Sequence, residues 1–217
     1  MSEIDKCRYF ETPEDIIERY VKFIKEAAEK GDVTEARRLL SDVIISYNDP
    51  ESKFLVKLCN ELEKVFPLKC PKFGTAFTAY KICEFVDDIN YRYALVDLEI
   101  PSTAARSSAF GNKCRCEKAL VKSIKPFTIL DNINHCRDLT IRIDKRIKFR
   151  SEPGKVAYSA MSYLYTNGKT YKYEVGQKVV ADAFDTFRWN ECSNGIHFFM
   201  TEEEALDYVQ LLRRIQL

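Results

Sequence analysis

The sequence predicts an α+β fold, in which a three-helix unit precedes a mainly antiparallel β-sheet domain with a C-terminal helix. Three observations support this prediction. Apolar residues recur at helical spacing up to about residue 65, runs with the alternation of strands begin at about residue 91, and helical spacing returns after Thr201. The expected division is residues 1–71 for the helical unit and 72–217 for the α+β domain.

The composition is that of an ordinary globular protein. Of the 217 residues, 46% are hydrophobic and 31% are charged, and 34 basic against 33 acidic side chains give a formal net charge of +1. This balance gives no support for nucleic-acid binding through net charge. The N-terminal residues lack the features of a signal peptide and no apolar run approaches membrane-spanning length, so we expect an intracellular protein that does not bind membranes.

The first three helices carry recognisable boundary signals. Thr12 is an N-cap in front of Pro13 and two acids, and Gly31 ends this helix. The second helix is expected at about 33–47 and the third at about 51–65, where Pro67 follows. Short connections predict antiparallel packing of consecutive helices. Such a unit is either a partner-binding helical hairpin or a cap that covers one face of the α+β domain.

The strand signals follow in the middle of the chain. Residues 73–86 are ambiguous between a strand and a short helix, whereas 91–100 is a clear strand that ends at Pro101. Further strands are expected at 118–124, 138–149 and 176–180. The runs 156–165 and 170–173 flank Asn167-Gly168, a strong signal for a β-hairpin.

The last unit is a turn, a strand and a helix. Asn194-Gly195 favours a turn because both residues tolerate positive φ, and the apolar run 196–200 predicts a buried strand. Thr201 followed by Glu204 is a capping box, so the final helix should begin at about Thr201.

Two blocks of this region resemble an uncharacterised domain of large DNA viruses and phages, which often follows pentapeptide repeats. The first runs from Ile100-Pro101 through Arg106-Ser107-Ser108 to Lys113-Cys114-Arg115-Cys116. The second comprises Tyr173, Gly176 and the run Cys192–Phe199. The resemblance covers about residues 91–208 and implies a viral protein of the host cytoplasm or the virion, without implying an activity.

Three thiols and one imidazole within these blocks form a candidate structural zinc site. The ligands would be Cys114, Cys116, Cys192 and His197, a set that suits tetrahedral zinc. The alternative is that the cysteines are small buried hydrophobes and that His197 is hydrogen-bonded beside its strand. A second candidate set is Cys70, Cys83, Cys136 and His135.

The same blocks contain candidate ligand-binding and catalytic residues. Guanidinium and hydroxyl donors that could bind a phosphate are Arg106, Ser107, Ser108, Lys113 and Arg115. The alternative is a solvated loop whose arginine pairs with an acid such as Glu191. An enzyme would use His197 as the base and Glu191 as orienter or acid, with Ser107, Ser108 or Cys192 as the nucleophile.

The favoured function is a non-enzymatic interaction or accessory module with a protein partner. The alternative is a small enzyme or binder that acts on a nucleotide or another phosphorylated ligand through Arg106 and His197. This alternative requires the two side chains to meet in an open pocket.

Overall fold

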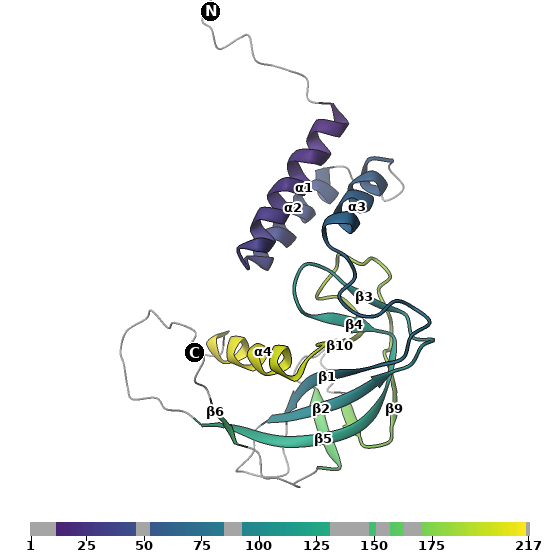
Figure 1. The fold of residues 1–217 in the computed structure, drawn as a ribbon, viewed down its shortest axis with the longest axis vertical. Coiled ribbons are helices and arrows are strands. Elements are labelled where there is room, and N and C mark those ends of the chain that lie inside the picture. The colour runs from purple at the N-terminus through teal and green to yellow at the C-terminus, as the bar shows by residue number, and fades with distance from the viewer. Residues whose placement is uncertain are drawn as a thin grey trace, which may run out of the picture. The chain divides into compact units, whose positions relative to one another are not determined.

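The computed structural model of the chain describes residues 12–46, 53–84, 93–130, 148–150, 157–162 and 171–215. The chain divides into two compact units, one formed by Met1–Leu68 with Ser108–Gly111 and the other by Lys69–Ser107 with Asn112–Leu217. The elements confirm the α+β class (Figure 1). None of the helices in the described ranges combines the length and apolar character that crossing a membrane requires.

The first unit contains α1 (Pro13–Glu29), α2 (Val33–Ser46) and α3 (Lys53–Val65). The predicted N-cap of α1 is confirmed: the backbone N–H of Asp15 donates to Thr12 Oγ1 at 3.2 Å, and that of Thr12 donates to Asp15 Oδ2 at 2.9 Å. Gly31 ends this helix with φ +78°, a value that side chains with a Cβ rarely adopt. Helix α1 packs against both other helices. The core of this unit consists of Ile17, Ile24, Ala27, Ala36, Leu40, Val43, Leu55, Leu58 and Leu62.

The second unit is built on an antiparallel sheet, which has seven strands within the described ranges. The order is β6-β5-β2-β1-β7-β8, with β9 paired to β5. The strands are β1 (Phe77–Glu84), β2 (Tyr93–Ile100), β5 (Lys118–Leu130), β6 (Lys148–Arg150), β7 (Ser159–Ser162), β8 (Lys172–Glu174) and β9 (Lys178–Val180).

The sheet curves back on itself through the turn that joins β8 to β9. The backbone N–H of Gly176 donates to Val121 O and that of Val121 donates to Gln177 O, each at 2.9 Å. Strand β1 pairs with β7, β7 pairs with β8, and β9, which follows β8 after this turn, pairs with β5. The path of strands therefore returns to β5. The side chains inside this curved sheet are almost all small or apolar: Ala79, Cys83, Ala94, Val96, Leu98, Ile100, Val121, Ile124, Tyr173 and Val179.

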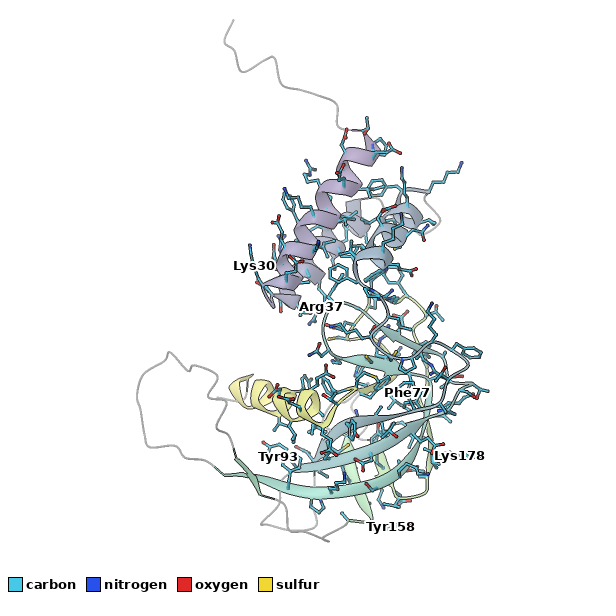
Figure 2. The ribbon with its side chains drawn as sticks, in the orientation of Figure 1. Lys30, Arg37, Phe77, Tyr93, Tyr158 and Lys178 are labelled. Atoms are coloured by element: carbon cyan, nitrogen blue, oxygen red, sulfur yellow. The ribbon has the colours of Figure 1, made fainter. Side chains whose placement is uncertain are left out.

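The opposite face of β1, β2 and β5 is covered by the C-terminal helix α4 (Glu202–Ile215). Ala205 and Val209 of α4 are fully buried against this face, and Tyr93, labelled in Figure 2, belongs to the same cluster. The other buried members are Ile82, Leu95, Phe127 and Phe199. Because successive side chains of a strand point to opposite faces, the sheet contributes to two cores, one inside the curved sheet and one under α4.

A second, smaller sheet has the order β10-β4-β3 among the described strands. Its strands are β3 (Arg106–Ser108), β4 (Cys114–Cys116) and β10 (Ile196–Phe198). Phe199, directly after β10, exchanges two backbone hydrogen bonds with Tyr80 of β1 at 2.9 and 2.7 Å. This bridge attaches the small sheet to β1 of the large one, at residues of β1 beyond its short pairing with β7.

Strand pairing determines the secondary structure of segments whose sequence patterns were ambiguous. Residues 77–84 of the ambiguous run form β1, because all eight pair with β2. Strand β5 extends beyond the predicted 118–124, because β9, β2 and β6 bond to it in succession. The predicted strand 138–149 lies outside the described residues except for its last two, which begin β6. The Asn167-Gly168 turn also lies outside them, while the strands on either side, β7 and β8, pair antiparallel.

Candidate functional site

The two sequence blocks meet at the β4–β10 pair. Its register places Ile196 opposite Cys116, His197 opposite Arg115, and Phe198 opposite Cys114. Because residues opposite one another share a face, His197 and Arg115 lie on one side of the pair and the two cysteines of β4 on the other. The fold therefore brings the blocks together but separates the imidazole from these two thiols.

The structure does not assemble the candidate zinc site. Within the described ranges, no group of three or more His, Cys, Asp or Glu side chains is placed to hold a metal ion. Cys114 and Cys116 are fully buried, whereas Cys192 is exposed with its sulfur 3.5 Å from Lys113 Nζ. The alternative set includes His135 and Cys136, which lie outside the described residues.

The guanidinium group of Arg106 is hydrogen-bonded to backbone carbonyl groups. Nε donates to Ala104 O at 3.0 Å, Nη1 to Thr75 O at 2.7 Å and Pro71 O at 3.4 Å, and Nη2 to Pro101 O at 2.7 Å and Ser102 O at 3.0 Å. The guanidinium also lies 5.2 Å from the ring centroid of Phe77. These contacts use all five N–H groups of the side chain. A phosphate would have to displace one of these bonds to bind here.

The two serines that follow Arg106 are buried. Ser107 is 4% exposed and Ser108 is 2% exposed. Ser107 Oγ has no hydrogen-bond partner among the described residues. A nucleophile needs a neighbouring base and access to the substrate, and burial limits that access.

Arg115 holds the loop that precedes β10. Its side chain is 2% exposed and donates to Asn194 O at 2.8 Å, Asp185 O at 3.1 Å and Phe187 O at 3.1 Å. Burial lowers the pKa of Arg115, and the nearby acids Asp185 and Glu191 partly offset this effect. Like Arg106, this predicted ligand-binding arginine therefore binds the backbone of its own chain.

His197 is held as a neutral imidazole. Burial lowers the pKa of His197 to about 2, and the positive charges of Lys113, Lys81 and Arg115 act in the same direction. A hydrogen bond with the backbone of Ser193 opposes these effects, while Nε2 is buried without a partner among the described residues. A group with this pKa is a weak base, and near neutral pH it is not in the imidazolium form that could act as a general acid. Glu191, its predicted catalytic partner, is only 4% exposed.

Lys81 is a functional candidate that sequence reasoning missed. It lies in β1 on the face that points inside the curved sheet, where its Nζ donates to His197 O at 3.1 Å and lies 5.6 Å from the ring centroid of Tyr173. Burial lowers the pKa of Lys81. Alternation with Ala79 and Cys83 in the ambiguous run 73–86 was the signal that could have identified it.

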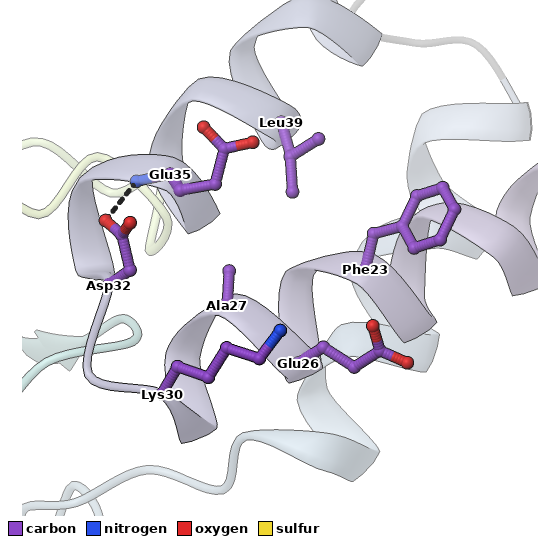
Figure 3. Close-up of a pocket in the computed structure, with 7 residues that line it drawn as sticks. All are labelled: Phe23, Glu26, Ala27, Lys30, Asp32, Glu35 and Leu39. Carbon is purple, nitrogen blue, oxygen red and sulfur yellow. Dashed lines mark hydrogen bonds between the residues drawn. The ribbon is translucent and has the colours of Figure 1, made fainter.

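A pocket of about 330 Å³ lies between α1 and α2 in the helical unit (Figure 3). Its apolar lining consists of Phe23, Ala27 and Leu39, and its charged lining consists of Glu26, Lys30, Asp32 and Glu35. Asp32 Oδ1 accepts the backbone N–H of Glu35 at 2.9 Å and so caps α2. The sequence predicted this hairpin as a partner-binding element or a cap, but no pattern indicated the pocket.

Comparison with known protein families matches residues 66–150 and 132–205 to a family described as a family of unknown function (DUF5758). The matched residues make up more than half of the chain and include both blocks. No curated protein and no solved structure is similar to this chain.

Proposed function

The chain belongs to DUF5758, a family of unknown function, and we propose that it acts as a non-enzymatic interaction module of a large DNA virus or phage. The contact site is the pocket between α1 and α2, and the partner is a protein segment. The resemblance of the two blocks to a viral and phage domain supports this origin, and with it we propose a location in the host cytoplasm or the virion.

The observation that carries this proposal is the pocket itself. A volume of about 330 Å³ is small but falls in the range of pockets that accept ligands or anchoring side chains. Phe23 on its wall is 43% exposed, so a partner that covers this ring would bury further apolar surface. Two helices with a groove between them that is apolar at its centre and charged at its rim suit an amphipathic segment.

The charges around the pocket indicate the chemistry of the partner. Three acids and one lysine line it, so its rim is net negative. Arg38 neutralises part of this charge, because it forms two hydrogen bonds of 2.7 Å with the Glu35 carboxylate. With Lys30 and Arg38 counted against the three acids, one net negative charge remains to attract a cation. The expected partner segment has an apolar anchor residue flanked by lysine or arginine.

The α+β domain supports a non-enzymatic role. Arg106 and Arg115 donate hydrogen bonds to backbone carbonyls. The pKa of His197 is too low for proton transfer near neutral pH. These side chains stabilise loops around the small sheet. The domain is thus suited to be a stable scaffold.

The test is a selection of random peptides displayed on phage against the full chain. Selected peptides should share an aromatic or aliphatic residue flanked by basic residues. Phe23→Glu should weaken their binding, measured as Kd by fluorescence anisotropy, by about tenfold or more, because the anchor loses its apolar contact.

The matched control is Val56→Glu, which changes an exposed apolar residue of α3 outside the pocket. Val56 is 52% exposed, and its replacement should leave Kd within about twofold. Equal losses in the two variants, or a selection that enriches no such peptides, would rule out this pocket as the docking site.

A further inference from the structure

The side chains of Lys113 and Cys192 meet at the surface of the α+β unit. Lys113 Nζ lies 3.5 Å from Cys192 Sγ, although the two residues are 79 positions apart in the chain. Cys192 is exposed, and Lys113 is half-buried. Reactive thiols are those that combine access to solvent with a neighbouring positive charge. An amine is therefore in contact with a thiol that a small oxidant can reach.

The fold holds both partners of this contact. Lys113 directly precedes β4, and its ammonium group lies 5.8 Å from the ring centroid of Tyr208 in α4. Arg115 of the same strand donates to Asn194 O at 2.8 Å, two residues beyond Cys192. Strand β4 thus follows directly on the amine and carries the side chain that holds the loop of the thiol. This arrangement keeps Cys192 within reach of Lys113.

We propose that dioxygen joins Lys113 and Cys192 through a covalent bridge in which one oxygen atom lies between Nζ and Sγ. The Lys113 ammonium group first gives a proton to water. The S–H bond, one N–H bond of the free amine and the O–O bond then break, and an N–O bond and an O–S bond form. The second oxygen atom leaves as water with the two hydrogens. Four electrons pass from the nitrogen and the sulfur to dioxygen.

The surroundings of Cys192 favour this product over the others that a thiol can give. Of the cysteines in the described ranges, Cys192 is the exposed one. An exposed thiol with no amine beside it is oxidised to a sulfenic acid or joins another thiol. Here the Lys113 amine lies in contact, and the inserted oxygen atom spans the gap between nitrogen and sulfur. Both residues belong to the α+β unit, so this proposal is independent of the pocket between α1 and α2.

The experiment incubates the reduced full chain in air-saturated buffer, blocks the remaining thiols in denaturant with iodoacetamide, and maps tryptic peptides by high-resolution mass spectrometry. Trypsin does not cleave at a bridged lysine, so the expected product joins residues 107–115 to residues 189–213. Its mass exceeds the sum of the two peptides, with Cys114 blocked, by one oxygen atom less two hydrogens. Dithiothreitol should release both peptides, and the product should be absent when dioxygen is excluded.

Two variants sharpen the result. Lys113→Arg keeps the positive charge but removes the amine, so it should abolish the linked product. The matched control is Lys118→Arg, which changes a lysine that pairs with Glu117 and should leave the yield unchanged. Circular dichroism checks that both variants fold, and the map of the unchanged chain decides the proposal even if Lys113→Arg does not. A direct N–S link without the oxygen, an oxygen added to Cys192 without a link, or a disulfide between two chains would each overturn it.

Discussion

Arg106 and Arg115 show how a single side chain can organise several loops. Each was predicted to bind a phosphate, because cations next to serines after a strand suit an anion. In the structure their partners are backbone carbonyls, including those of Thr75 and Asn194, which lie far from them in sequence. Every residue carries a backbone carbonyl, so the sequence does not show which carbonyls accept from an arginine. Residue types alone therefore could not distinguish an arginine that bonds to loops from one that binds a ligand.

His197 gives a pH-dependent prediction. Its pKa in the folded state is about 2, well below the ordinary value of 6.5. As the pH falls below 6.5, only the unfolded chain takes up this proton, so the stability contributed by His197 is present above pH 6.5 and is lost toward pH 2. The loss is about 1.4 kcal/mol of unfolding free energy per pH unit. His197→Asn should remove this slope.

Urea unfolding at pH 7 and pH 5, followed by Trp189 fluorescence, measures the effect. Between these two conditions the unchanged protein should lose about 2 kcal/mol more than His197→Asn. The other histidine, His135, is present in both proteins and therefore cancels. Equal losses, or an NMR titration that places the pKa of His197 near 6.5, would contradict the assignment.

At the scale of elements, helix ends were the most predictable features. The capping box of α4 is present: the backbone N–H of Glu204 donates to Thr201 Oγ1 at 3.1 Å, and that of Thr201 donates to Glu204 Oε2 at 3.3 Å. A cap involves residues three apart, so the local sequence contains all of it. By contrast, β1 and the full length of β5 depend on pairing with distant strands.

This cap gives a prediction for α4. Thr201→Ala should lower the unfolding free energy by about 1 kcal/mol, because the N–H of Glu204 loses its acceptor. Thr201→Ser keeps the hydroxyl and should cost much less. Thermal unfolding of the three proteins by circular dichroism compares them, and similar midpoints for the Ala and Ser variants would show that the hydroxyl does not stabilise the helix.

At the scale of the whole molecule, the chain has two units with separate cores. Leu58 in α3 and Leu98 in β2 are both fully buried, one in each unit. The single tryptophan, Trp189, lies in the α+β unit, whereas far-UV circular dichroism is dominated by helices and three of the four helices in the described ranges belong to the other unit. Two spectroscopic probes therefore report on different units.

We expect matched substitutions to affect the units separately. Leu58→Ala should destabilise the helical unit by about 2–5 kcal/mol and shift the circular dichroism transition in urea, with Trp189 fluorescence unchanged. Leu98→Ala should shift the fluorescence transition by a similar free energy. If either substitution moves both transitions together, the two units unfold as one cooperative structure.

The sequence by itself determined the α+β class, the caps that begin α1 and α4, the end of α1, and the two blocks that resemble one domain family. These features depend on periodicity and on residues a few positions apart. Only the tertiary structure decided which side chains meet: it separated His197 from the thiols of β4 and placed Lys81 inside the sheet. Such contacts join residues remote in sequence, and their partners are set by strand register and loop path.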